Sequence, residues 1–182
     1  MKNMTKLLSD KEVIQKVLDQ ISDKTTDLGD QTWRESVENY RSEKRFSTEL
    51  DLFQRLPIVF CPSAALAKSG SYVARDVGGV PLLAVRGKDG VVRTFHNSCR
   101  HRGMILAEGS GNASKFICRY HAWAYGLDGN LLNVSGNEGF PDLDKNSHGL
   151  IEVETQEKCG LILVTQKKAI SDGALASLPT LI

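Results

Sequence analysis

The sequence is short of cysteine and has no long hydrophobic run and no run of lysine or arginine. Four cysteines among 182 residues are too few for a secreted scaffold held by disulfides. No apolar stretch approaches the roughly 20 residues of a membrane-spanning helix, and residues 1–10 lack the apolar segment of a secretory signal. We therefore expect a cytoplasmic chain that does not span a membrane and does not depend on disulfides.

Charge is unevenly distributed along the chain. Residues 1–56 carry 10 basic and 11 acidic side chains, residues 57–131 carry 9 and 4, and residues 132–182 carry 4 and 7. The basic middle segment has no regular lysine or arginine stripe, so we expect no nucleic acid partner. Two interpretations of the excess charge stay open, namely a basic rim that attracts an acidic protein and ordinary solvated surface charge.

The N-terminal third is expected to be helical. Ser9 and Glu12 form a capping-box pattern, and apolar residues follow it with helical spacing, which predicts a helix over residues 9–22. A weaker helix is expected over residues 30–41, with one apolar face made by Trp33, Val37 and Tyr40. Either helix could bind a partner, but packing against the rest of the chain is the interpretation we favour.

The character of the sequence changes after Pro57, where short β-rich runs separated by glycine-containing turns begin. This spacing predicts a mainly β, antiparallel sandwich or barrel. Cys61 and Cys159 lie in or beside apolar runs, and we expect both in the core. The expected strands are residues 58–61, 72–77, 81–86, 91–95, 116–118, 151–155 and 161–165.

Two mixed pairs of cysteine and histidine stand out in the basic segment. They are Cys99-x-His101 and Cys118-x-x-His121, separated by 16 residues. Two thiolates and two imidazoles fit either a tetrahedral zinc or a Rieske [2Fe-2S] cluster, in which two histidines bind one iron and two cysteines the other. Zinc sites usually group like ligands, whereas here each pair is mixed, and this favours the cluster.

The residues around these pairs resemble the cluster loops of Rieske non-haem iron oxygenases of the ring-hydroxylating type. The resemblance covers roughly residues 40–166 and includes the strand-like run 91–97. It rests on Cys-x-His-Arg-Gly at 99–103, Cys-x-Tyr-His-x-Trp at 118–123 and Tyr-x-x-Asp-Gly at 125–129. One departure is Ala122, where the family usually has glycine. If the residue needs a positive φ, alanine is strained there.

The resemblance implies a role for each residue of the two loops. Cys99 and Cys118 would bind one iron, and His101 and His121 the other, with the second ring nitrogen of each histidine facing solvent or a partner. The histidine edge would then be the port for electrons. The resemblance also implies four residues around the ligands, which would shield the cluster, support the loops or allow a tight turn. They are Arg102, Gly103, Tyr120 and Trp123.

Comparison with Rieske proteins of respiratory cytochrome complexes predicts a low reduction potential. Those proteins have an extra disulfide-forming cysteine in each loop, where this chain has Met104 and Tyr120, and a serine that donates to the cluster, where it has Trp123. Fewer donors to sulfur stabilise the reduced cluster less. We expect the lower part of the Rieske range of about −150 to +300 mV.

The mononuclear iron site of such oxygenases is not expected in this chain. That site uses two histidines and a carboxylate, and after His121 only His148 remains. His96 is expected to be structural, and acidic residues near His148 lack the spacing of a metal site. The chain alone is therefore not expected to catalyse oxygenation.

The predicted fold is a mainly β, antiparallel Rieske-type sandwich with a small cluster-binding subdomain and an N-terminal helical arm. The expected divisions are an arm (1–45), a Rieske domain (46–166) and a tail or start of a catalytic domain (167–182). The function that we favour is electron relay for an oxygenase large subunit, and the alternatives are a free-standing ferredoxin-like carrier and a redox-sensing protein. Expected partners are a reductase or ferredoxin as electron donor, a non-haem iron domain or subunit, and further copies of the chain in a homotrimer.

Overall fold

The computed structural model describes residues 8–29 and 31–167, so the expected tail over residues 167–182 lies outside the described residues except for its first residue, Lys167. The chain divides into two units, residues 1–41 and residues 42–182. The domain boundaries expected at 45/46 and 166/167 stay predictions.

The first unit contains helix α1 (Asp10–Asp23) and the single turn α2 (Glu38–Arg41). The capping box that predicted α1 is present: Ser9 Oγ accepts the N–H of Glu12, whose carboxylate accepts from Ser9. The apolar stripe of α1 is exposed rather than buried. The second predicted helix is wrong over residues 31–37, because the Ser36 hydroxyl accepts the N–H of Glu38 and the helix begins only there.

The second unit begins with helix α3 (Glu43–Arg55), which the sequence analysis did not predict. Its N-terminus is capped by Ser42, whose hydroxyl accepts the N–H of Arg45 at 3.2 Å. The far end of α3 meets the end of the last strand, since Lys167 donates its N–H to the carbonyl of Gln54 and its Nζ to Asp51. No helix among the described residues is long and apolar enough to cross a membrane.

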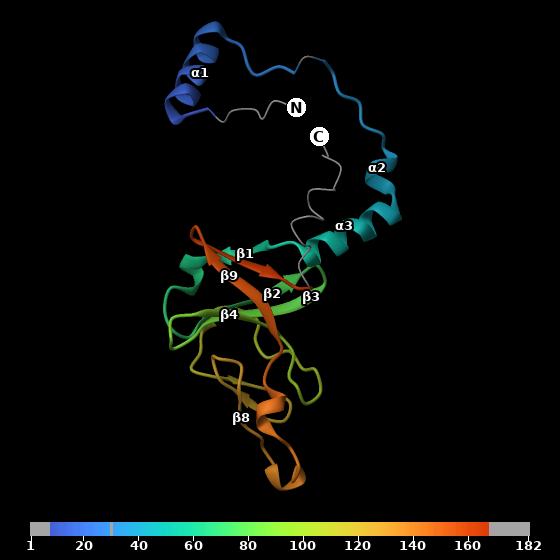
Figure 1. Cartoon of the computed structure of the whole chain (residues 1–182), viewed down its shortest axis with the longest axis vertical. Coiled ribbons are helices and arrows are strands. Elements are labelled where there is room, and N and C mark those ends of the chain that lie inside the picture. Colours follow the sequence, from blue (N-terminus) through green and yellow to red (C-terminus); the bar gives the residue numbers. More distant parts are fainter. Residues whose placement is uncertain (1–7, 30, 168–182) are drawn as a thin grey trace, which may run out of the picture. The chain divides into compact units, whose positions relative to one another are not determined.

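The second unit is dominated by a seven-stranded antiparallel sheet in the order β1-β10-β9-β4-β3-β2-β5. Figure 1 labels β1, β2, β3, β4 and β9 of this sheet. Its strands are β1 (Ile58–Pro62), β2 (Ser71–Val77), β3 (Val80–Arg86), β4 (Val92–His96), β5 (Gly109–Asn112), β9 (Glu152–Lys158) and β10 (Leu161–Thr165). A second antiparallel sheet is built from β6 (Phe116–Ile117), β7 (Ala124–Tyr125) and β8 (Leu131–Asn133). Three 3₁₀ turns complete the fold: Ser63–Leu66, Asn137–Gly139 and Lys145–His148.

The predicted mainly β, antiparallel fold is confirmed. All seven expected strands are present, with ends within three residues of those expected, and β5, β7 and β8 were missed. These three strands are only two to four residues long, and β5 reads Gly-Ser-Gly-Asn, so they carry no alternating apolar pattern.

One cysteine lies where we expected it and one does not. Cys61 is buried on β1, as predicted. Cys159 is exposed, so its predicted place in the core is wrong. It forms the two-residue turn of the β9–β10 hairpin with Gly160, and both residues have positive φ, 51° and 76°. A turn of this type projects from the end of the sheet into solvent.

The core of the second unit has two parts. One lies along the large sheet and includes Phe60, Leu66, Leu82 and Ile162. The other surrounds the two Cys/His loops and joins residues of β3 and β4 to the small sheet, among them Phe95, Trp123 and Tyr125. The loops therefore pack between strands β3 and β4 of the large sheet and the small sheet.

Candidate metal centre

Two loops carry the four predicted ligands and bring the two histidines together. The first loop, residues 97–108, leaves the end of β4, and the second loop, residues 118–123, joins β6 to β7. The imidazole rings of His101 and His121 lie with their centroids 4.7 Å apart at an interplanar angle of 67°. Cys99 and Cys118, which begin the two turns, are free thiols only 2% and 3% exposed.

The first loop is a closed backbone turn. Cys99 donates its N–H to the carbonyl of Met104, and Gly103 donates back to the carbonyl of Cys99, both at 2.8 Å. Gly103 has φ of 71°. These two bonds fix the thiol at the start of the turn and leave His101 and Arg102 at its tip.

The second loop repeats this turn. Cys118 donates to the carbonyl of Trp123 at 2.8 Å, and Ala122 donates back to the carbonyl of Cys118 at 3.0 Å. Ala122 stands at the same offset from its cysteine as Gly103 and also has positive φ, 55°. The strain expected at Ala122 is therefore present, because a Cβ atom is disfavoured in this conformation.

The donor set tests whether the residues fit a metal cluster. The Nδ1 atoms of both His101 and His121 are buried without a hydrogen-bond partner, although buried polar nitrogens are nearly always partnered. Two such nitrogens beside two buried free thiols fit a group that supplies the missing bonds. In the described part of the chain, no three His, Cys, Asp or Glu side chains are grouped so that they could hold one metal ion. A Rieske cluster does not need such a group, because each of its irons takes only two protein ligands.

Aromatic side chains enclose His101 on its inner side. The ring of Trp123 stacks on His101 at 4.9 Å and 9°, and Phe140 meets both rings edge-on at 5.7 Å. Trp123, one of the four predicted neighbours of the ligands, is only 2% exposed and lies against His101. Burial, together with the nearby His121 and Arg102, lowers the pKa of His101, which favours the neutral imidazole that metals bind.

The other predicted neighbours lie on the outside. The ring of Tyr120 lies over His121 with centroids 3.8 Å apart and an interplanar angle of 33°, and Tyr120 is itself 58% exposed. Arg102 and Gly103 are exposed at the tip of the first loop. The structure places Trp123 and Tyr120 against the histidines, while the roles of all four predicted neighbours stay predictions.

The sequence analysis did not identify Tyr125 as part of the site. Its hydroxyl lies 3.4 Å from Cys99 Sγ and accepts the N–H of Arg100 at 3.0 Å. Burial raises the pKa of Tyr125, and the bond to Cys99 raises it further, so the phenol keeps its proton. The signal was present in the Tyr-x-x-Asp-Gly motif, but the motif alone does not show where the hydroxyl points.

Asn97 is a second residue that the sequence analysis missed. It is 3% exposed, its Oδ1 accepts the N–H groups of Leu106 and Ala107, and its Nδ2 donates to the carbonyl of Ala107 at 2.7 Å. These bonds tie the two ends of the first loop together. Asn97 thus sets the position of Cys99 and His101 without touching them.

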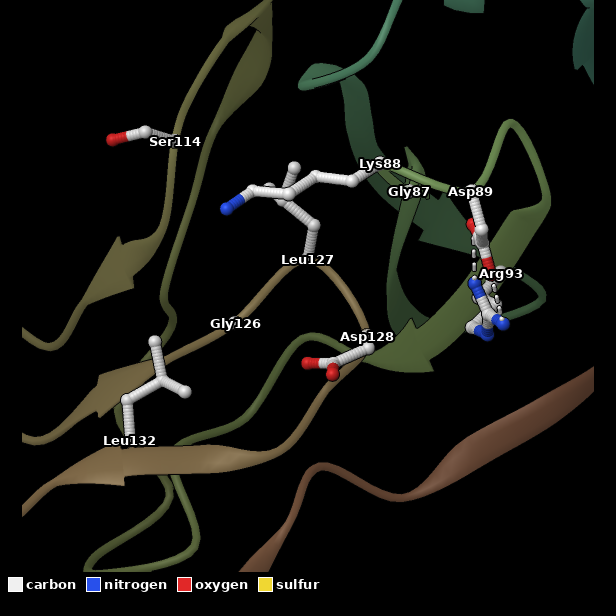
Figure 2. A pocket seen from close by; sticks show the side chains of 9 residues that line it. All are labelled: Gly87, Lys88, Asp89, Arg93, Ser114, Gly126, Leu127, Asp128 and Leu132. Atoms are coloured by element: carbon white, nitrogen blue, oxygen red, sulfur yellow. Dashed lines mark hydrogen bonds and ion pairs between the residues drawn. The ribbon is translucent and has the colours of Figure 1, made fainter.

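The remaining histidines lie outside this group. His96 ends β4, as expected of a structural residue, and His148 lies 6.3 Å from Trp123 with its Nδ1 near the carbonyl of Asp144. A pocket of about 280 Å³ also lies elsewhere, between the β3–β4 turn and the β7–β8 turn (Figure 2). Its charged lining residues are Lys88, Asp89, Arg93 and Asp128.

Comparison with known proteins agrees with this geometry. Residues 57–144 match the model of the Rieske [2Fe-2S] domain family. The chain is 35% identical over 136 residues to the carnitine monooxygenase oxygenase subunit of Escherichia coli (strain K12), covering 74% of this chain and 36% of that protein. It is 41% identical over 132 residues to the chlorobenzene dioxygenase subunit alpha of Cupriavidus sp. (strain PS12), covering 67% and 29%. The chain thus spans about a third of the length of these relatives.

Solved structures show the same fold. The apo form of a quaternary ammonium Rieske monooxygenase superposes with a TM-score of 0.70 at 30% identity, covering 77% of this chain and 41% of that one. Naphthalene 1,2-dioxygenase with bound indole superposes with a TM-score of 0.64 at 32% identity, covering 69% and 29%. Both similarities extend over most of this chain and under half of the larger one.

Proposed function

Because the chain carries a Rieske [2Fe-2S] domain similar to those in the oxygenase subunits of Rieske oxygenases, we propose that it relays single electrons to an oxygenation site in protein outside this sequence. The observation that carries the proposal is the pair of buried, unpartnered Nδ1 atoms of His101 and His121, on loops that also carry two buried thiols. A bound [2Fe-2S] cluster supplies the one-electron oxidation and reduction.

We propose that Cys99 and Cys118 hold one iron and that His101 and His121 hold the other, each histidine through Nδ1. The repeated backbone turns support this assignment, since each loop presents its cysteine in the same hydrogen-bonded position. The Nδ1 atoms are the buried ones, which leaves the Nε2 atoms to face outward.

The surrounding residues control access and charge. Trp123 and Phe140 pack on His101 and exclude water from that side. Tyr125 keeps its proton and directs it toward Cys99 Sγ, where it offsets negative charge on the sulfur.

The partners follow from the relatives as proposals. The relatives are named as oxygenase subunits acting on carnitine in one case and chlorobenzene in another. We propose that this chain serves oxygenation of a small organic substrate by a non-haem iron domain or subunit, receives electrons from a reductase or ferredoxin, and assembles as a homotrimer. These relatives have different substrates, so the Rieske domain itself selects none of them.

The experiment that tests the proposal is electron paramagnetic resonance of the full chain, reconstituted with iron and sulfide and reduced with dithionite. We expect two irons and two sulfides per chain and a rhombic signal with an average g below the free-electron value, because histidine ligation makes the two irons unequal. Replacing any one of Cys99, His101, Cys118 or His121 by alanine should abolish the signal.

Matched controls use cysteine and histidine side chains outside the two loops. Cys159→Ser and His148→Gln should retain the iron, the sulfide and the signal, since neither side chain reaches the two loops' thiols or imidazoles. One tightly bound zinc without sulfide would overturn the proposal. A stable trimer in analytical ultracentrifugation would support an oxygenase subunit, whereas a monomer would favour a free-standing carrier.

A further inference from the structure

Two hairpin turns of the second unit share one backbone pattern. The β3–β4 turn reads Gly-Lys-Asp-Gly over residues 87–90, and the β7–β8 turn reads Gly-Leu-Asp-Gly over residues 126–129. In each turn the first glycine donates its N–H to the carbonyl four residues later, at 2.8 and 2.9 Å, and accepts the N–H of the second glycine at 3.1 Å. Both turns line the pocket of about 280 Å³ that Figure 2 shows.

The aspartate of each turn is held in the same place. Its Oδ1 accepts the N–H two residues later, at 3.1 Å for Asp89 and 3.2 Å for Asp128. Each carboxylate lies over the first glycine of its own turn, because a Cβ atom added at Gly87 or Gly126 would collide with it. Both carboxylates are therefore fixed before any ligand arrives, which lowers the entropic cost of binding one.

The two turns differ in what their carboxylates bind. Asp89 holds the guanidinium of Arg93 through two hydrogen bonds, at 3.1 and 2.7 Å. Arg93 lies four residues after Asp89, and the residue at the same offset from Asp128 is Leu132. Among the described residues, Asp128 has no ion-pair partner, and only Asn130 donates to its oxygens. The second turn thus presents the same carboxylate without the cation that the first turn supplies.

Lys88 is a second charged group of the pocket that is left without a partner. Its ammonium makes no ion pair with any residue in the ranges 8–29 and 31–167. Figure 2 shows the side chains of Lys88 and Asp128 leaving their turns toward the side of the pocket where Ser114 and Leu132 lie. Leu132 and the buried Leu127 add an apolar wall. The pocket thus offers a cation, an anion and an apolar surface between its two turns.

We propose that this pocket binds a small zwitterion, whose cationic end pairs with Asp128 and whose carboxylate pairs with Lys88. A guanidinium suits Asp128 because Arg93 already makes that contact with the equivalent Asp89. The volume lies just below the roughly 300–1,000 Å³ of ordinary small-molecule sites, which favours a ligand of amino-acid size. None of the four candidate cluster ligands lines this pocket, so the proposal adds a binding function to the electron relay.

A ligand with a single charge fits the pocket less well. A lone anion would meet the like charge of Asp128, and a lone cation would meet that of Lys88. A metal ion lacks ligands, since Asp89 is already bound by Arg93, and the described part of the chain contains no group of three His, Cys, Asp or Glu side chains for one. A zwitterion meets an opposite charge at both ends.

The test is isothermal titration calorimetry of the full chain with 4-guanidinobutyrate, a flexible zwitterion with a guanidinium at one end and a carboxylate at the other. We expect saturable binding of one molecule per chain. Butylguanidine and butyrate, which each keep one charge, should bind about tenfold or more weakly. Neither the iron content nor the reduction potential enters this measurement, so its outcome is separate from that of the proposed function.

Three variants locate the binding. Lys88→Gln and Asp128→Asn should each lower the affinity about tenfold or more. Asparagine keeps the turn, because its side-chain oxygen also accepts the N–H two residues later. Leu132→Arg places a guanidinium where the first turn has Arg93, and it should abolish binding by occupying the carboxylate from within the chain.

Matched controls make the same charge changes outside the pocket. They are Lys68→Gln and Asp142→Asn, at exposed positions that do not line it, and both should keep the affinity. Four results would overturn the proposal. These are no saturable heat with millimolar 4-guanidinobutyrate, an equal loss of affinity in the pocket and control variants, unchanged affinity in Leu132→Arg, and binding of butylguanidine or butyrate as tight as that of 4-guanidinobutyrate.

Discussion

The hydroxyl oxygen of Tyr125 lies 3.4 Å from Sγ of Cys99 and accepts the N–H of Arg100 at 3.0 Å. Since the backbone N–H already donates to this oxygen, the phenol proton is free to point at the sulfur. The sulfur of Cys99 therefore has a hydrogen-bond donor even though Trp123 stands where respiratory Rieske proteins have a serine.

Removing this hydroxyl should lower the reduction potential. Tyr125→Phe takes away a bond that is stronger when the cluster is reduced and more negative. A difference of about 1 kcal/mol corresponds to about 40 mV for one electron, so we expect a fall of roughly that size in a spectroscopic redox titration. Tyr72→Phe, on β2, is the control and should leave the midpoint unchanged. An unaltered midpoint in Tyr125→Phe would contradict the assignment.

Substitutions at Ala122 and Gly103, the loop residues with left-handed backbone, should change the stability of the protein in opposite directions. Ala122→Gly should stabilise the protein by about 1 kcal/mol, because glycine has no Cβ penalty at φ of 55°. Gly103→Ala should destabilise it by about 1–2 kcal/mol through the same penalty, since an added Cβ meets only Ser98 Oγ, at an uncrowded 3.8 Å. Thermal unfolding of the cluster-loaded chain measures both. Changes of the same sign would show that the two turns are not equivalent.

Loss of the Asn97 side chain should loosen the first loop. Asn97→Leu removes three hydrogen bonds and leaves the N–H groups of Leu106 and Ala107 without their acceptor. We expect a loss of about 2–4 kcal/mol in the free energy of unfolding, measured by urea titration, and a lower iron content after purification. Asn133→Leu on the exposed face of β8 is the control. Retention of full stability in Asn97→Leu would contradict the proposed support.

The ion pair between Arg86 and Glu157 predicts a pH dependence of stability. Two hydrogen bonds, at 2.8 and 3.1 Å, join the side chains across β3 and β9. The hydrogen bonds from Arg86 lower the pKa of Glu157 below its usual 4.5, so the stabilisation is present above pH 4.5 and disappears as pH falls through the lower folded-state value.

Glu157→Gln is the variant that checks this dependence. It should cost about 1 kcal/mol at pH 7, a modest value because Glu157 is partly exposed, and little at pH 3. Unfolding measured at both pH values gives the difference directly. An equal cost at the two pH values would show that the contact is not an ion pair in solution.

The strands of the fold were predictable because most of them carry β-branched and aromatic runs between glycine turns. Ile58–Pro62 and Leu161–Thr165 are apolar segments that pair with each other in the large sheet. Helix α3 was missed because its apolar residues are sparse and its cap, Ser42, lacks the glutamate of a capping box.

The candidate site was predictable as far as the identity of its side chains. The spacing of Cys99, His101, Cys118 and His121 indicated a shared centre, and the structure brings the two imidazoles together. The spacing in the sequence could not show the hydrogen bonds of Asn97 or Tyr125. Those bonds depend on how the end of β4 and the two-residue strand β7 are placed beside the loops, and this placement is set by packing between segments distant in sequence.

The exposed turn at Cys159 gives the molecule a built-in attachment point for a probe. Of its four thiols, the other three are buried, so a maleimide or a nitroxide reagent should react at Cys159 alone. A nitroxide there and the paramagnetic reduced cluster would form a spin pair within one chain. Pulsed dipolar spectroscopy of that pair would give the distance from the hairpin tip to the cluster without any engineered cysteine.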